Sequence, residues 1–124
     1  MIQIKNAEVY SNLLSVKYHP ILIEMELWIL QRYSGIVVTS GYRLGDLGVH
    51  GTDPCRGKDI RGRRLMFTLN NVDIGPTSAE SLCAAVNVAW KYDARRPQKM
   101  CAIFHDTGQG EHIHLQVCHK TKLR

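Results

Sequence analysis

The sequence predicts one α+β domain over residues 1–124, with two main helices packed on a small, mainly antiparallel sheet. Three observations support this. Two segments carry apolar residues at helical spacing, short β-branched runs are bounded by glycine, and a turn-rich segment separates two strand-like runs near the C-terminus. The chain is 44% hydrophobic and 22% charged, which suits a globular domain and excludes a disordered or collagen-like chain.

The first half of the chain predicts a helix, a strand and a long loop. Proline suits the first turn of a helix, so a helix should begin at Pro20 and end at Ser34–Gly35. The β-branched run 36–40 lies between glycines and predicts a buried strand. Residues 41–64 are rich in Gly, Arg and Asp and predict a long loop, with a strand beginning near Asp59.

The next segment predicts a strand over 65–69 and then the second main helix. Thr77 and Glu80 have the spacing of a capping box, in which the threonine hydroxyl accepts a hydrogen bond from the Glu80 N–H. The helix that they begin should end before Pro97. Its apolar stripe contains Leu82, Ala85, Val86, Ala89 and Trp90.

A β-hairpin is predicted near the C-terminus. Its strands are the runs 100–105 and 112–118, and the residues between them, 106–111, are turn formers. We interpret His105 and Asp106 as a polar pair that flanks the turn.

The formal charge of +5 and the isoelectric point of about 9.2 suggest an affinity for polyanions. Nucleic acid and anionic cell-wall polymer fit this charge equally well. The basic residues cluster in 56–64 and in 95–99. Solvated loops without a partner are an equally good explanation of such clusters.

The cysteine pattern argues against a structural four-thiolate zinc site, because the sequence contains no C-x-x-C pair. The N-terminus shows no secretory signal, so we expect reduced, buried thiols. The longest apolar stretch, 21–30, is interrupted by Glu24 and Glu26 and is too short to span a membrane. The four cysteines are Cys55, Cys83, Cys101 and Cys118.

The histidines suggest a metal site. Residues two apart along a strand point to the same face, so His112 and His114 should project together. A catalytic zinc site needs three protein ligands and an open position, so further ligands should come from elsewhere in the chain. The glycine-rich loop offers His50, Asp53 and Asp59.

Three segments, in this order, resemble a known family. Thr39–Arg43 is similar to that family's strand-end segment, whose arginine faces the substrate. His50 with Gly57–Ile60 is similar to its histidine and aspartate zinc ligands, and Glu111–His114 to its final block. On these motifs the chain resembles the zinc D-Ala-D-Ala carboxypeptidase and L-alanyl-D-glutamate endopeptidase family, which has the Hedgehog/DD-peptidase fold. The resemblance covers about residues 36–117.

The resemblance implies that His50, Asp59 and His114 bind one zinc ion and leave a position for water. Eight residues separate His50 from Asp59, more than is usual in the family, which leaves Asp53 as a rival ligand. We prefer Asp59, because Ile60 follows it as in the family pattern.

The resemblance also assigns roles around the metal. Glu111 is the expected general base. In a flat strand Glu111 and His114 would face opposite ways, so we expect Glu111 on the turn, which neighbouring glycines allow. His112 is the second candidate for the base, or a donor to the transition state. Arg43 suits a substrate carboxylate or a developing oxyanion.

The function implied is that of a zinc metallopeptidase, with Zn²⁺ as cofactor, which hydrolyses a D-amino-acid-containing bond in peptidoglycan stem peptides. Small, basic members without a signal are typical of bacteriophage lysis or virion enzymes. The expected location is therefore virion-associated, or cytoplasmic before release. The basic surface could help to hold an anionic wall polymer, and no membrane partner is expected.

Two alternatives stay open. The first is a non-catalytic, zinc-stabilised binding or virion-structural module of the same fold. Glu111 argues against it, because such a module has little reason to keep an acid beside the metal histidine. The second is a metal-dependent nuclease, suggested by the charge and the histidines. The sequence contains no nucleic-acid-binding motif and only 7% aromatic residues, which disfavours nucleic acid as the partner.

Overall fold

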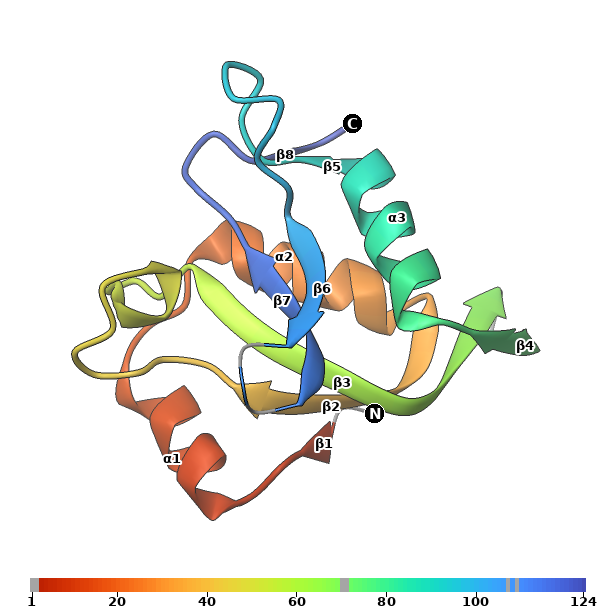
Figure 1. Ribbon diagram of the computed structural model, residues 1–124, viewed down its shortest axis with the longest axis horizontal. Coiled ribbons are helices and arrows are strands. Elements are labelled where there is room, and N and C mark those ends of the chain that lie inside the picture. The colour runs from red at the N-terminus through yellow and green to blue at the C-terminus, as the bar shows by residue number, and fades with distance from the viewer. Residues whose placement is uncertain (1–2, 70–71, 107, 109) are drawn as a thin grey trace.

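The computed structural model describes residues 3–69, 72–106, 108 and 110–124. Within them it confirms an α+β protein with a mainly antiparallel sheet of six strands, which curls into a half-barrel (Figure 1). It contains three α-helices where two main ones were predicted, and the additional helix is α1 (Ala7–Ser15). None of the helices in this described part is long and apolar enough to span a membrane.

The sheet is built around the long strand β3, which has partners along both edges. β2 pairs with one edge of β3, while β7 and β4 pair with different parts of it, and β6 continues the sheet beyond β7. β1 adds to β2 in parallel, and the other pairings are antiparallel. The strands are β1 (Gln3–Ile4), β2 (Tyr33–Ser40), β3 (Gly57–Leu69), β4 (Val72–Thr77), β6 (Ala102–Asp106) and β7 (Glu111–Gln116).

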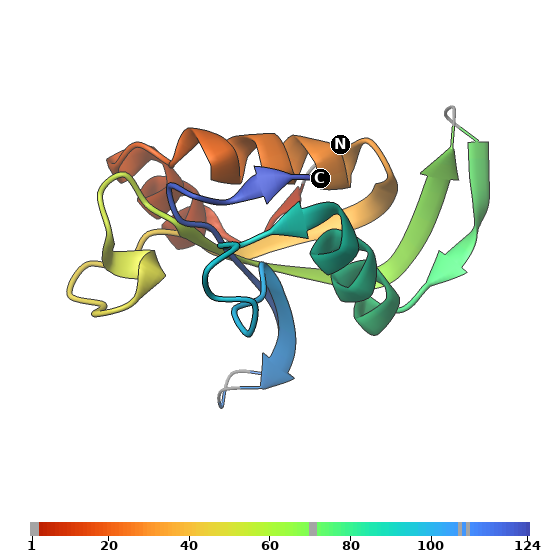
Figure 2. The same cartoon turned by 90° about the horizontal axis from the view of Figure 1, so that it is seen from above.

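The core lies between the sheet and two helices, α2 (Pro20–Leu30) and α3 (Ala79–Ala89). Figure 2 shows α2 lying along one face of the sheet. Burial of apolar side chains between these layers is the main stabilising contribution to the fold. The fully buried side chains include Leu22, Met25, Ile29, Ile36, Ile60, Leu82, Val86, Ile113 and Leu115. A second, two-stranded sheet pairs β5 (Trp90–Lys91) with β8 (Lys122–Leu123).

The helix α2 ends earlier than predicted. It ends at Leu30, and Ser34–Gly35, the predicted end, lie inside β2. Tyr33 is buried, and its ring meets Phe67 of β3 edge to face, with centroids 5.5 Å apart. Gly35 has a φ of 76°, which glycine adopts without strain, at an irregularity in the β2–β3 pairing. This glycine therefore marks a bulge in a strand and not the end of a helix.

Strand β3 takes up a third of the predicted long loop. The strand expected near Asp59 and the one expected over 65–69 are a single strand that begins at Gly57. The strand predicted over 36–40 is confirmed within β2. Glycine and charged residues made the start of β3 look like a loop, but pairing with three neighbouring strands overrides that local preference.

The helix α3 begins one residue later than the predicted capping box. Its N-cap is Ser78, whose Oγ accepts a hydrogen bond from the Ser81 N–H at 3.1 Å. Thr77 is the last residue of β4, so its hydroxyl does not cap the helix. The helix ends at Ala89, and Trp90, predicted on its stripe, begins β5 instead.

The C-terminal hairpin is confirmed. β6 and β7 pair with His105 directly opposite His112. Asp106 stabilises the connection, because its Oδ1 accepts hydrogen bonds from the N–H groups of Gly108 and Gly110. Two residues of the predicted turn, Thr107 and Gln109, lie outside the described residues.

Candidate metal centre

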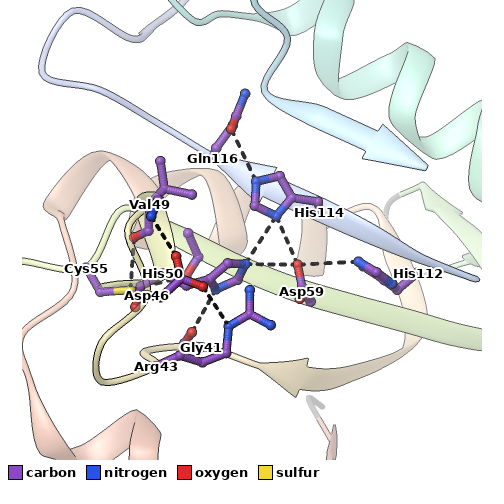
Figure 3. Close-up of polar contacts among 12 residues, drawn as sticks. Gly41, Arg43, Asp46, Val49, His50, Cys55, Asp59, His112, His114 and Gln116 are labelled. Carbon is purple, nitrogen blue, oxygen red and sulfur yellow. Dashed lines mark hydrogen bonds and ion pairs between the residues drawn. The ribbon is translucent and has the colours of Figure 1, made fainter. Parts of the chain in front are cut away.

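The structure brings together His50, Asp59 and His114 from three separate elements (Figure 3). His50 lies in a short 3₁₀ helix, η1 (Val49–Gly51), in the loop before β3. Asp59 lies near the start of β3, and the β3–β7 register places it directly opposite His114. One ligand atom from each of the three side chains lies within 4.8 Å of the other two. The side chains of His50 and Asp59 are buried, and that of His114 is mostly so.

The three ligand atoms are in mutual contact. The Asp59 Oδ1 lies 3.2 Å from the His50 Nε2 and 3.0 Å from the His114 Nδ1. The two imidazole nitrogens lie 3.2 Å apart. We refer to these three residues as the His–Asp–His group.

Hydrogen bonds outside the group orient both imidazoles. The His50 Nδ1–H donates to the Gly41 carbonyl at 2.7 Å, which leaves the lone pair of Nε2 facing Asp59. On the other side, the His114 Nε2–H donates to the Gln116 Oε1 at 3.2 Å. The Gln116 amide is itself oriented, because its NH₂ donates to the Met100 carbonyl at 2.8 Å.

With neutral imidazoles, this arrangement points two nitrogen lone pairs and a carboxylate oxygen at one another. Three acceptors at about 3 Å repel each other unless a cation lies among them, either a metal ion or a proton added to an imidazole. Two histidines and one aspartate are donors that zinc prefers, and three ligands leave an open position. The His–Asp–His group is therefore one that could hold a metal ion.

Asp59 remains ionised at neutral pH. Burial by itself would raise its pKa, but hydrogen bonds with His114 and His50, together with the charge of these imidazoles, lower the pKa well below the usual range. Asp59 therefore offers an anionic oxygen to any cation that the group holds.

Two glycines allow the loop to carry His50 to this position. A Cβ at Gly51 would lie 1.8 Å from the backbone carbonyl oxygen of Asp46, so the close turn that contains His50 requires glycine at position 51. A Cβ at Gly41 would lie 2.4 Å from the Tyr18 hydroxyl. That hydroxyl accepts a hydrogen bond from the next backbone N–H, at Tyr42, and so helps to place the Gly41 carbonyl that orients His50.

A hollow of about 160 Å³ opens beside the His–Asp–His group. Its remaining wall contains two further histidines and three basic side chains, which make it strongly polar and basic. These other lining residues are Lys5, Thr39, Ser40, Arg43, Arg61, His105 and His112.

His112 and His105 lie next to the group. The His112 Nδ1–H donates to the Gly110 carbonyl at 3.0 Å, so its Nε2 is the acceptor nitrogen, and it lies 3.9 Å from the Asp59 Oδ1. The rings of His105 and His112 meet edge to face, with centroids 4.7 Å apart. Burial, together with the charges of the neighbouring imidazoles, lowers the pKa of His105.

The other predicted site residues, Arg43, Asp53 and Glu111, lie outside the His–Asp–His group. Arg43 lines the hollow, and its Nε lies 3.4 Å from the Asp46 carboxylate. Asp53, the rival ligand, is exposed and lies outside the group. Glu111 is the first residue of β7 and not a turn residue. It is exposed and lines a neighbouring hollow, whose wall also contains Phe104, Arg61 and His112. Because β7 begins at Glu111 and side chains alternate between the two faces of a strand, the Glu111 side chain lies on the face opposite that of His112 and His114.

Three residues of the site were not predicted as such. Gln116 could have been found from strand alternation, since it follows His114 by two positions on the same face. His105 was interpreted as a turn residue, but its partner in the hairpin is His112. Lys5 gave no local signal, because only the parallel β1–β2 pairing brings it to the hollow.

Comparisons of the chain with models of protein families, with curated proteins and with solved structures found no match.

Proposed function

We propose that this protein is a zinc-dependent peptidase that cleaves a D-amino-acid-containing bond in peptidoglycan stem peptides. The observation that supports a metal enzyme most directly is the His–Asp–His group, whose acceptor atoms converge beside an open, basic hollow. When bound there, zinc would supply Lewis-acid chemistry, lowering the pKa of water and polarising a carbonyl group. The choice of a peptide substrate rests on the sequence motifs around Arg43, His50 and His114.

We assign the general base to His112. Its Nδ1–H is held by the Gly110 carbonyl, so its free Nε2 can accept a proton from water in the hollow. Glu111, the base that the sequence motif favours, is not among the residues that line this hollow, and it lines a neighbouring one together with His112. A histidine already oriented beside the metal ligands is therefore the better placed of the two.

The wall of the hollow suits an anionic substrate. Lys5, Arg43 and Arg61 line it, and the acid among its lining residues is Asp59, which belongs to the His–Asp–His group. Arg43 in particular can pair with a substrate carboxylate or with negative charge that develops on a carbonyl oxygen. Stem peptides with free carboxylates match this charge.

The test combines elemental analysis of the purified protein with mass spectrometry of digested peptidoglycan. We expect about one zinc ion per chain and new peptide termini, and His114→Ala should lose both. A protein without stoichiometric metal would overturn the proposal at its first step.

A non-catalytic module of the same architecture is the second candidate, and it is favoured because Glu111 does not line the hollow beside the His–Asp–His group. The same experiment separates the two functions. Stoichiometric zinc without new peptide termini from any wall type would support the module, because the metal would then stabilise the fold without turnover.

A further inference from the structure

Basic residues also cluster at the end of the β6–β7 hairpin that lies opposite its turn. β5 and β8 pair, with Lys91 opposite Lys122, and this pairing carries the tail of the chain back to the loop 92–99 (Figure 1). The Arg124 N–H donates to the Ala89 carbonyl at 2.7 Å and holds the tail there. We call this surface the basic end, and its members are Lys91, Arg95, Arg96, Lys99, Lys120, Lys122 and Arg124.

The charge of the basic end is one-sided. It holds seven of the chain's 16 lysines and arginines, and Asp93 is the one acidic residue within 89–105 and 117–124. Asp93 is buried and already paired: its Oδ2 accepts from the Arg96 Nε at 3.0 Å, and its Oδ1 from the Arg95 N–H at 2.9 Å. A single buried carboxylate cannot balance seven basic side chains, so this surface has a large excess of positive charge.

The basic end also contains a hollow of about 290 Å³, which shares no lining residue with the hollow beside the His–Asp–His group. Lys91, Lys99 and Arg124 line it, together with Trp90. The indole Nε1–H of Trp90 is buried and has no acceptor among the described residues. An anionic oxygen in this hollow would find three cationic residues in its walls, beside the already paired Asp93.

We propose that the basic end binds the polyol-phosphate polymer of a bacterial wall and so holds the protein on its substrate. This inference rests on the proposed function for its wall setting, while the surface itself is independent of the metal centre. A polymer with many phosphates suits a cluster of exposed lysines and arginines, because binding releases counterions from the polymer. The exposed members are Arg95, Lys99, Lys120, Lys122 and Arg124.

The aromatic residues of the basic end favour this polymer over single-stranded nucleic acid. Both Trp90 and Tyr92 are buried, and the Arg96 guanidinium lies over the Tyr92 ring. Neither ring is free to stack on a base, and such stacking provides much of the affinity of proteins for single strands. The surface thus offers charge without a platform for bases.

The test measures binding of the full chain to poly(glycerol phosphate) at several salt concentrations. In Lys120→Gln/Lys122→Gln we expect affinity at low salt to fall roughly tenfold, and the slope of log affinity against log salt to become shallower by up to about 2. Lys120→Arg/Lys122→Arg should bind like the parent, because it keeps both charges. Lys17→Gln removes an exposed lysine elsewhere and should have little effect.

A second double variant tests whether the first one acts only by disturbing the C-terminal tail. Arg95→Gln/Lys99→Gln lies in the loop 92–99 and should weaken binding to a similar degree. Unchanged binding in both double variants would overturn the proposal, as would duplex DNA that competes more tightly than the polymer. Hydrolysis of a small soluble peptide and zinc content should be unaffected in these variants. If the parent hydrolyses no peptide while the variants lose polymer binding, the proposed function fails, whereas polymer binding by the basic end stands.

Discussion

At the scale of single residues, the chemistry of the His–Asp–His group depends on side chains that do not belong to it. The Gly41 carbonyl and the Gln116 amide each accept the N–H of one imidazole, so both lone pairs point inward. A histidine can carry its proton on either nitrogen, and these partners decide which. The ability to bind a metal ion is therefore tested at the partners as well as at the ligands.

Gln116→Met should weaken zinc binding by about 10- to 100-fold without unfolding the protein. The thioether fills similar space but leaves the His114 Nε2–H without its acceptor, so the imidazole can rotate or change tautomer. Affinity is measured by competition with a chelator of known strength. Gln98→Met, at an exposed position in the loop 92–99, is the control. Equal affinity in both variants would show that Gln116 does not orient His114.

His112→Ala should retain zinc and lose turnover by about 10²- to 10⁴-fold, the usual contribution of a general base. Its Nε2 lies 3.9 Å from the Asp59 Oδ1, while Glu111 does not line the hollow beside the His–Asp–His group. Glu111→Gln is the matched comparison and should keep most of the activity on soluble peptides. The reverse result, with loss of activity in Glu111→Gln alone, would show that the glutamate reaches the metal and is the base.

The site was predictable in part at this scale. Strand alternation correctly placed His112 and His114 on one face, and the sequence motifs singled out His50 and Asp59. The orientation of the imidazoles was not predictable, because it depends on a backbone carbonyl and an amide brought in by the fold. Glu111 was expected on the turn, but β7 begins at that residue, and a shift of one strand position changes the face.

At the scale of elements, the largest difference between the prediction and the structure is the extent of β3. The segment contains glycines and several arginines, so its local pattern predicted a loop followed by a short strand. In the structure the segment pairs with β2, β4 and β7, and these long-range partners are invisible in a local pattern. The predicted helices had clear apolar spacing and were found, while their ends depended on cap and bulge geometry at Ser78 and Gly35.

Ser78→Ala should destabilise the protein by about 1 kcal/mol, because it removes the side-chain acceptor for the Ser81 N–H at the start of α3. Thr77→Ala is the comparison, since Thr77 ends β4 and caps nothing in the structure. Urea denaturation of both variants measures the free energy of unfolding. A larger loss in Thr77→Ala than in Ser78→Ala would restore the capping box predicted from the sequence.

At the scale of the whole molecule, the core encloses all four cysteines as free thiols. Burial raises the pKa of Cys83 to about 11 and that of Cys101 to about 12. Only the thiolate reacts with alkylating reagents, so at pH 8 these cysteines should label slowly in the folded protein and rapidly in urea. Mass spectrometry after timed labelling with iodoacetamide checks this. Rapid modification of Cys101 in the native protein would contradict the core described here.

The metal centre should also couple to the stability of the whole fold. His50, Asp59 and His114 come from a loop and two strands, so a bound ion would link the loop 41–56 to the centre of the sheet. Zinc at 100 times its dissociation constant should add about 2.7 kcal/mol to the free energy of unfolding. For a chain of this size that corresponds to a rise in Tm of roughly 10 °C.

Calorimetry with and without a chelator measures the rise in Tm. Two variants in the loop 41–56 show whether this rise depends on the metal ligand. His50→Ala should show no response to zinc, because it removes a ligand. Leu47→Ala, whose side chain is fully exposed, should respond like the parent. If the parent itself shows no rise in Tm, the cation among the three acceptors is a proton held by the imidazoles, and both the zinc centre and the peptidase proposal fail together.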